Sequence, residues 1–138
     1  MRISRALLDE LVGHAVASPG AEVCGMVAGR DGEATRVLPV RNAAPRPERA
    51  YAMDPNDQHR VFTAIEDAGE DLLAIYHSHP PVGAYFSETD MRMAYTEDGE
   101  HELWPGTLYV VVGLRPFGVR TFAIADHHAH EVELEVVG

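Results

Sequence analysis

The sequence predicts an α/β fold in which a central mixed β-sheet is flanked by helices. Segments with strand and helix patterns alternate along the chain, which is typical of α/β domains. The segment 71–79 is nearly all apolar, as expected for a strand at the centre of a sheet. With 138 residues, of which 46% are hydrophobic, one domain can bury about two thirds of its unfolded surface. No internal repeat is visible, and we expect residues 1–138 to form this single domain.

The first third of the chain predicts a helix and a β-hairpin. Residues 4–18 place apolar side chains at helical spacing, and Ser18-Pro19-Gly20 ends the pattern. This stripe consists of Leu7, Leu8, Leu11, Val12, Ala15 and Val16. Residues 22–28 and 35–40 have strand patterns. The segment Gly29-Arg30-Asp31-Gly32 between them contains Asp-Gly, which favours a tight hairpin turn.

A surface loop, a second helix and the central strand are expected next. Residues 42–49 contain two prolines and no periodicity, which predicts a loop. Asp54 followed by Pro55 is a strong helix start, because the carboxylate caps free N–H groups and proline suits the first helical position. The helix should run to about residue 68. The strand 71–79 follows it.

The C-terminal half predicts a short helix and three further strands. Ser87-Glu88-Thr89-Asp90 has the spacing of a capping box, with Asp in place of the usual Glu, and it should open a helix over residues 87–95. The charged segment 97–102 is expected to be a loop. Strands are expected near 107–113, 118–125 and 130–137.

Composition limits the classes of function. The chain has 11 basic and 22 acidic residues, a formal charge of -11, which argues against nucleic-acid binding because phosphate recognition needs a basic surface. The single Cys24 excludes an internal disulfide and fits a reducing compartment. No run approaches the ~18 apolar residues of a membrane span, and the N-terminus does not resemble a signal peptide. We therefore expect a cytoplasmic protein without membrane contact.

The strongest functional signal lies at the end of the central strand. His77 and His79 point to the same face of a strand, and Asp90 follows from the start of the next helix. Two imidazoles and a carboxylate, with a fourth position left to water, are the ligand set of catalytic zinc sites. Each residue also has a structural explanation. His79 could bond to the backbone at the strand end, and Ser87 and Asp90 could serve only as helix caps.

A hydrolytic metal site also needs a base to accept a proton from water. Glu22 is the candidate, because it stands in an otherwise uncharged run, Ala21 to Ala28, where apolar surroundings would raise its pKa. The alternative is a solvated Glu22 at the mouth of the strand.

The residues carry a family resemblance. Glu22, followed by His77-Ser78-His79-Pro80 and Ser87-Glu88-Thr89-Asp90, resembles the pattern of the JAMM (MPN+) zinc metallopeptidases, a Glu upstream of His-x-His-x7-Ser-x-x-Asp, with no departure in spacing. The resemblance covers nearly the whole chain. It implies an MPN/JAB fold, a three-layer arrangement of the kind seen in cytidine deaminases.

The resemblance also implies roles. His77, His79 and Asp90 would hold one Zn²⁺, Glu22 would activate water, and Ser87 would stabilise the oxyanion. Family members cleave peptide or isopeptide bonds after the C-terminal Gly-Gly of ubiquitin-like proteins. This short chain is similar to the small bacterial members, which process sulfur-carrier proteins and release cysteine or a similar extension. The particular carrier, the leaving group and a homodimer through the first helix all stay open.

The sequence is also compatible with two other functions and two other sites. A scaffold of MPN type could bind through its surface without catalysis, and a DNA-repair-associated relative carries a similar spacing. The complete ligand set argues against the first and the acidic charge against the second. Cys24 could lie near the metal or be an inert core residue. Asp126-His127-His128-Ala129-His130 could bind a second metal, but its place between two strands favours an exposed turn.

Overall fold

The computed structural model describes residues 1–138 and contains three helices and eight strands. The helices are α1 (Arg5–Val16), α2 (Pro55–Asp67) and α3 (Glu88–Met93). The strands are β1 (Arg2–Ser4), β2 (Cys24–Arg30), β3 (Glu33–Val40), β4 (Asp71–His79), β5 (Leu108–Leu114), β6 (Phe117–Ala125), β7 (His128–Val132) and β8 (Glu135–Val137). None of the helices is both long and apolar enough to cross a membrane.

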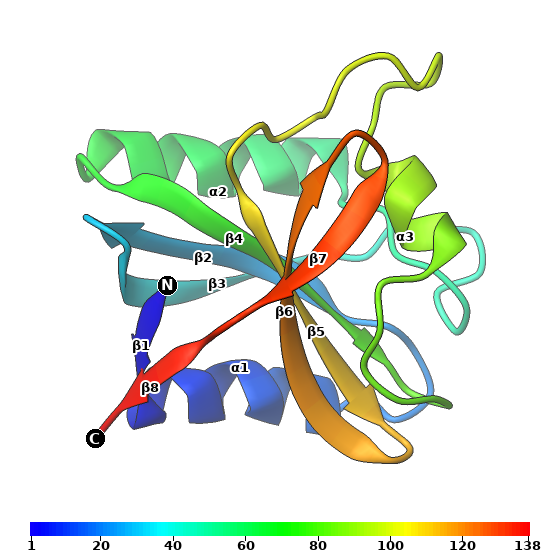
Figure 1. Cartoon of the computed structure of the whole chain (residues 1–138), viewed down its shortest axis with the longest axis horizontal. Helices are drawn as coiled ribbons and strands as arrows, with labels where there is room; N and C mark the ends of the chain where they lie inside the picture. The colour runs from blue at the N-terminus through cyan, green and yellow to red at the C-terminus, as the bar shows by residue number, and fades with distance from the viewer.

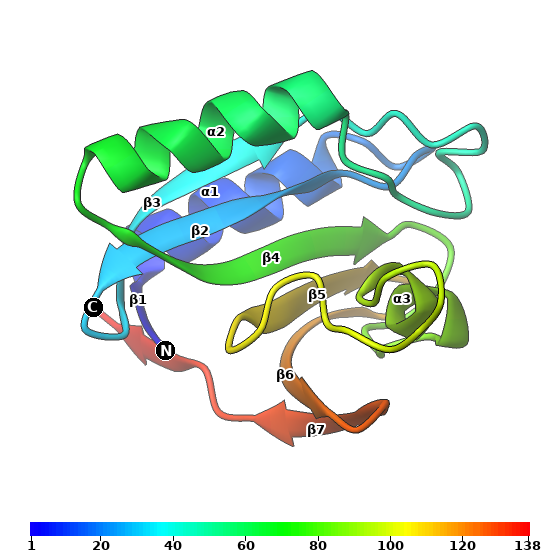
Figure 2. The ribbon, with the colours of Figure 1, turned by 90° about the horizontal axis from the view of Figure 1, so that it is seen from above.

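All eight strands form one mixed sheet in the order β7-β6-β5-β4-β2-β3-β1-β8. The central β4 pairs antiparallel with β2 and parallel with β5. The strands twist strongly across the sheet, and the two termini lie near each other at its β1–β8 edge (Figures 1 and 2). Because β4 and β2 run in opposite directions, the carboxyl end of β4 lies beside the amino end of β2, with His77 opposite Cys24.

Helices cover both faces of the sheet, which confirms the predicted α/β architecture (Figure 1). The core accordingly divides into two clusters. Leu8, Leu11 and Ala15 of α1 pack on one face with Ala74 and Tyr76 of β4. The other cluster lies on the opposite face of β4, where Ile75 packs with residues of α2 and of the loop after α3. These residues are Val61, Ile65, Ala94 and Tyr95. Both faces of β4 therefore pack against apolar side chains, as the nearly all-apolar sequence of this strand predicts.

Each helix begins at a side-chain cap that the sequence places there. Ser4 Oγ accepts a hydrogen bond from Leu7 N at 3.1 Å at the start of α1. Asp54 caps α2 by accepting from Asp57 N at 3.0 Å, with Pro55 as the first helical residue. At α3 the predicted capping box of Ser87 and Asp90 is complete. These local hydrogen bonds satisfy N–H groups that a helix start leaves free.

The structure corrects the predicted strands at the two chain ends. Residues 2–4 form a strand that their sequence pattern does not predict, and the expected strand 130–137 is divided into β7 and β8. β7 pairs with β6, whereas β8 crosses to the far edge and pairs in parallel with β1. Strands of three residues are too short to show the alternation on which a prediction depends. Their stability comes from this long-range pairing.

Candidate metal centre

The candidate site forms at the carboxyl end of β4. His77 and His79 are 0% and 5% exposed and point to the face that α2 covers, with ring centroids 5.0 Å apart. The two-residue period of the strand brings the rings together, as the His-x-His spacing predicts. Fully burying two imidazoles requires polar partners for their ring nitrogens.

Asp90 supplies a carboxylate from the first turn of α3. Its Oδ2 atom lies 3.0 Å from Nε2 of His77 and 3.1 Å from Nε2 of His79. The same oxygen accepts a hydrogen bond from Ser87 N at 3.0 Å, and Asp90 N donates to Ser87 Oγ at 3.0 Å. Asp90 is therefore both a helix cap and a member of the site. The two interpretations of the sequence are compatible, because the cap fixes the carboxylate against the histidines.

Glu22 reaches the site from the segment that leads into β2. Glu22, His77 and His79 each offer one ligand atom, and these three atoms lie within 4.8 Å of one another. The Glu22 residue is only 7% exposed. The solvated alternative for Glu22 is therefore wrong. Its expected place at the start of the strand 22–28 is also wrong, since β2 begins two residues later, at Cys24. The N–H of Glu22 donates to Pro47 O at 2.7 Å, outside the sheet ladder.

Different contacts orient the two imidazoles. Nδ1 of His79 lies 3.3 Å from the carbonyl oxygen of Gly83, which directs Nε2 toward Asp90. A hydrogen bond of this kind on the outer nitrogen is typical of metal-binding histidines. The ring of His77 instead stacks on Tyr51, with centroids 4.5 Å apart and planes 22° apart.

Unpartnered buried atoms provide a test of whether a metal fits here. Both ring nitrogens of His77 and Oε1 of Glu22 are buried without a hydrogen-bond partner. His77 Nε2 is close to Asp90, but not in hydrogen-bonding geometry. Such orphaned groups are rare in folded proteins and indicate a missing ligand. Nitrogen and oxygen donors of this kind suit zinc, so the residues fit the expected ion.

The surroundings move the pKa values of the two carboxyl groups in opposite directions. Burial raises the pKa of Glu22 to about 7, where the negative charge of Asp90 adds to the effect and His79 opposes it. Burial would also raise the pKa of Asp90, but the neighbouring His77 and His79 and the Ser87 N–H hold it well below its usual range. A permanently ionised carboxylate suits metal binding, whereas one that titrates near neutrality can accept and return a proton.

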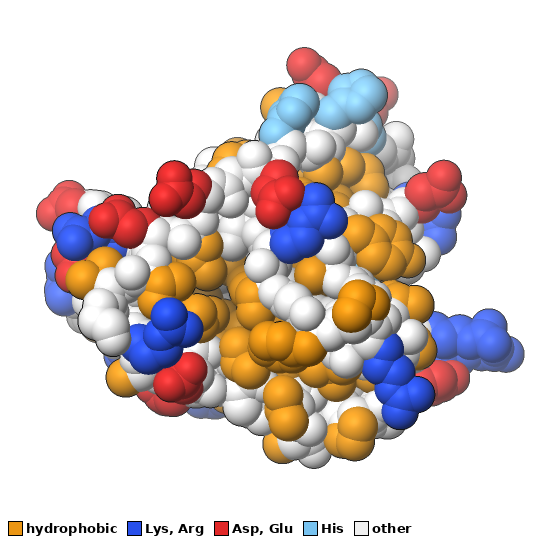
Figure 3. Space-filling model, turned by 60° about the horizontal axis from the view of Figure 1, so that its bottom comes forward, with side chains coloured by type: hydrophobic (Ala, Val, Ile, Leu, Met, Phe, Trp, Pro, Cys, Tyr) orange, Lys and Arg blue, Asp and Glu red, His pale blue; other side chains and the backbone are white.

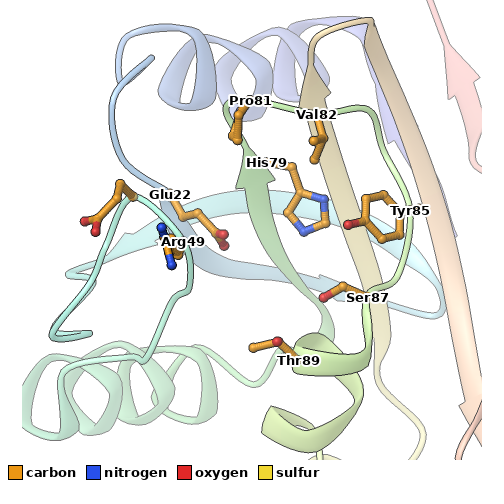
Figure 4. Close-up of a pocket in the computed structure, with 9 residues that line it drawn as sticks. Glu22, Arg49, His79, Pro81, Val82, Tyr85, Ser87 and Thr89 are labelled. Atoms are coloured by element: carbon orange, nitrogen blue, oxygen red, sulfur yellow. The ribbon is translucent and has the colours of Figure 1, made fainter.

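A pocket of about 240 Å³ opens over these groups, lined by residues that include Glu22, Arg49, His79, Tyr85 and Ser87. Figure 4 shows Glu22 and Arg49 on one side of His79, with Tyr85 and Ser87 on the other. The Ser87 hydroxyl accepts the cap hydrogen bond from Asp90 N, which leaves its own proton free to donate.

Close packing holds the segment between β4 and α3 that forms one wall of this pocket. A Cβ atom on Gly113 of β5 would overlap the backbone of Gly83 and Ala84, so only glycine permits the approach. Arg120 donates to the carbonyl oxygen of Ala84 at 3.0 Å on the same segment. This packing fixes the loop that carries Tyr85 and Ser87.

Several supporting residues gave no recognisable signal in the sequence. Asn42 donates to the carbonyl oxygens of Glu22 and Ala50 at 2.9 and 3.1 Å. Its Oδ1 also accepts from Ala44 N and Ala52 N at 2.9 and 3.0 Å, so one amide joins the 42–52 loop to the backbone of Glu22. Ser78, between the two histidines, accepts from Val23 N at 2.9 Å. These contacts link residues far apart in the chain, which spacing alone cannot reveal.

Two further groups of residues were candidates for a role at a metal site, Cys24 and the histidines after β6. Cys24 is fully buried and directs Sγ toward Val40 O at 3.4 Å, which supports its interpretation as a core residue. Of the segment 126–130, which was expected to be a turn, only Asp126 and His127 form the turn between β6 and β7, whereas residues 128–130 belong to β7. Histidine side chains stand out at one end of the molecule in Figure 3, and His127, His128 and His130 are all exposed. His127 stacks on Tyr95 with centroids 3.9 Å apart.

Comparisons with known proteins find relatives with peptidase names. The chain is 38% identical over 110 residues to a desampylase from Haloferax volcanii, covering 75% of this chain and 73% of that protein. It is 35% identical over 136 residues to the CysO-cysteine peptidase of Mycobacterium tuberculosis, covering 95% and 87% of the two chains. A probable TtuB-protein conjugate cleaving protease from Thermus thermophilus is 36% identical over 135 residues, with 98% and 82% covered.

The fold and the family agree as well. A JAB1/MPN domain protein from Archaeoglobus fulgidus matches 100% of this chain and 97% of its own with a TM-score of 0.63, a likeness of fold at 19% identity. A family model described as prokaryotic homologs of the JAB domain matches residues 4–130. The resemblance expected from the His-x-His and Ser-x-x-Asp motifs is thereby confirmed, and the chain belongs to the prokaryotic JAB-domain family of JAMM-type proteins.

Proposed function

We propose that this chain is a zinc-dependent peptidase that hydrolyses the amide bond after the C-terminal Gly-Gly of a ubiquitin-like sulfur-carrier protein, releasing cysteine. The observation that carries the proposal is the convergence of two buried imidazoles with two carboxyl groups of opposite pKa shift. The names of the three relatives support a peptidase or conjugate-cleaving activity.

In this proposal His77, His79 and Asp90 hold the zinc ion. Bound there, zinc would lower the pKa of a water molecule and polarise the scissile carbonyl group. Asp90 is assigned as the third ligand, rather than Glu22, because its Oδ2 lies within 3.1 Å of both Nε2 atoms and its pKa is held low. The hydrogen bond from Ser87 N to Asp90 supports that orientation.

Glu22 and Ser87 act on the substrate. Glu22, with its raised pKa, accepts a proton from the attacking water and returns it to the nitrogen of the leaving group. The water oxygen forms a new bond to the carbonyl carbon and the C–N bond breaks. Both protons of the water end on the leaving nitrogen, so the products are a carboxylate and an ammonium group. Ser87 donates its free proton to the carbonyl oxygen as negative charge develops there.

The proposed partner is a carrier whose flexible tail ends in Gly-Gly. The site is a pocket of about 240 Å³, which favours residues without large side chains next to the scissile bond. An extended tail can be held mainly by main-chain pairing, as strand-addition complexes are. The acidic charge of -11 gives nucleic acid no basic surface to bind. We place the reaction in the cytoplasm, consistent with the single reduced Cys24, and within one domain of residues 1–138.

Hydrolysis of a carrier fusion tests the function. A ubiquitin-like carrier extended by Gly-Gly-Cys should lose cysteine in the presence of the zinc-loaded enzyme, measured by mass spectrometry. The Glu22→Gln variant should keep its zinc and lose activity, whereas Glu66→Gln, the same change at an exposed position on α2, should behave as wild type. Near-normal turnover by Glu22→Gln would remove Glu22 as the base. Failure of the zinc enzyme on every Gly-Gly tail would contradict the function.

A further inference from the structure

Arg49 occupies a position that the mechanism above does not use. It lines the pocket over the histidines and also a neighbouring cavity of about 420 Å³. The two spaces share Glu48, Arg49 and Pro81 and are therefore adjacent. The exposed Arg49 therefore places a cation at the border between the pocket over the histidines and the neighbouring cavity.

The guanidinium group of Arg49 has no partner within the chain. Five of the eleven arginines form ion pairs, and of the six that do not, only Arg49 lines the pocket over the histidines. Arg49 forms no ion pair or side-chain hydrogen bond, not even with Glu48 beside it. Although the protein has a net charge of -11, an unpaired arginine at the pocket can bind a negatively charged group of a ligand.

The backbone around Arg49 is held in place relative to Glu22. Arg49 N donates to Arg46 O at 3.0 Å within a turn, and Glu22 N donates to Pro47 O of that turn at 2.7 Å. Asn42 also bonds the carbonyl oxygens of both Glu22 and Ala50. The base and the guanidinium group are thus carried by segments that are hydrogen-bonded to each other, which favours a defined binding geometry.

The proton transfer by Glu22 assigns the Glu22 side of the pocket to the leaving group. Glu22 returns a proton to the leaving nitrogen, so the residue attached to that nitrogen must lie next to Glu22. Figure 4 places Arg49 on this side of His79 and Ser87 on the opposite side. In a released C-terminal amino acid, the α-carboxylate is only two bonds from the leaving nitrogen.

We propose that Arg49 binds the free α-carboxylate of the leaving residue and makes the enzyme selective for a single C-terminal amino acid. This inference rests on the proposed function and specifies its leaving group. An isopeptide bond to a lysine side chain has methylene groups at the corresponding position, and its carboxylate is too distant to reach Arg49. The planar guanidinium group suits bidentate binding of a carboxylate.

A pair of tail peptides tests the proposal. Both end in Gly-Gly-Cys, one with a free carboxylate and one with a C-terminal carboxamide, and kcat/KM is measured for each with the zinc-loaded protein. The wild type should favour the acid by about 10- to 100-fold, the usual effect of a hydrogen bond to a charged group. Arg49→Gln should bring the ratio close to one by weakening only the acid. Arg49→Lys, which keeps the charge without the planar fork, should give an intermediate ratio.

Arg46→Gln provides the matched control, because Arg46 is exposed on the same loop and lines neither cavity. It should keep the wild-type ratio, and all variants should keep the wild-type zinc content. Equal rates of the wild type on the acid and the amide would overturn the role of Arg49 and leave the peptidase function intact. An equal loss by Arg49→Gln on both peptides would overturn it as well. No hydrolysis of either peptide or of the carrier fusion would instead contradict the proposed function itself.

Discussion

Replacing Ser87 with alanine separates two roles of one hydroxyl group. Its oxygen accepts the cap hydrogen bond from Asp90 N at 3.0 Å, and its proton is assigned to the oxyanion. The substitution removes both, but it leaves the Ser87 main-chain N–H that donates to Asp90 Oδ2 at 3.0 Å. The orientation of Asp90, and with it the zinc content, should therefore survive.

The two losses differ in magnitude. Removing a serine cap costs about 1 kcal/mol of stability. Even a domain of only about 5 kcal/mol would keep more than roughly 99% of its molecules folded after that loss. Removing one oxyanion donor lowers kcat by about 100- to 1,000-fold, or about 2.7 to 4 kcal/mol. Loss of folded protein therefore cannot account for the expected loss of activity.

The assay measures kcat on the carrier fusion, together with zinc per chain and the midpoint of thermal unfolding. Ser4→Ala is the matched control, because Ser4 caps α1 through the same kind of bond but lies outside the pocket. It should lower the midpoint by a few degrees and leave kcat unchanged. Ser87→Thr, which keeps both an acceptor and a donor, should recover most of the activity. A kcat of Ser87→Ala within about threefold of wild type would refute the oxyanion role.

Two further predictions concern the supports of the site and the fold. Asn42→Ala leaves up to four backbone groups without their hydrogen-bond partner. It should therefore lower the free energy of unfolding, measured by urea unfolding, by about 1–3 kcal/mol. It should also reduce kcat/KM in the peptidase assay. The exposed Asn56→Ala is its control, and equal activity of both variants would contradict the role of Asn42. The second concerns Glu70, whose pKa is lowered by the hydrogen bond from Thr35 and by Arg36, although burial opposes the shift. A carboxyl group whose pKa is lower in the folded than in the unfolded state stabilises the fold at pH values above its unfolded pKa of 4.5. This contribution is lost as the pH falls through the folded-state pKa. The difference in unfolding free energy between wild type and Glu70→Gln should therefore shrink from pH 7 to pH 3, and a constant difference would contradict the ion pair's contribution.

The parts of the site that the sequence predicted are those encoded by short-range geometry. The period of a strand places His77 and His79 on one face, and the capping box orients Asp90 at the start of α3. Both depend on residues at most a few positions apart. Glu22 was identified from its uncharged neighbours, but the contact itself depends on the antiparallel pairing of β2 with β4.

The features that the sequence did not predict depend on long-range contacts. The stacking of Tyr51 on His77 joins residues from separate elements. The amide of Asn42 and the approach of Gly113 to the loop after β4 do so as well. The strand β1 exists because its partner β8 comes from the opposite end of the chain. Periodicity and spacing describe neighbours in the sequence, so these contacts could be found only in the folded structure.

The metal content of the purified protein and of its ligand variants shows whether His77, His79 and Asp90 hold a zinc ion. Elemental analysis should find about one zinc ion per chain in the wild type and in Glu22→Gln, and almost none in His77→Ala, His79→Ala or Asp90→Asn, with each variant shown to be folded by circular dichroism. Folded wild-type protein without stoichiometric zinc would contradict the account. So would zinc that survives in Asp90→Asn but is lost in Glu22→Gln, because Glu22 would then be the third ligand.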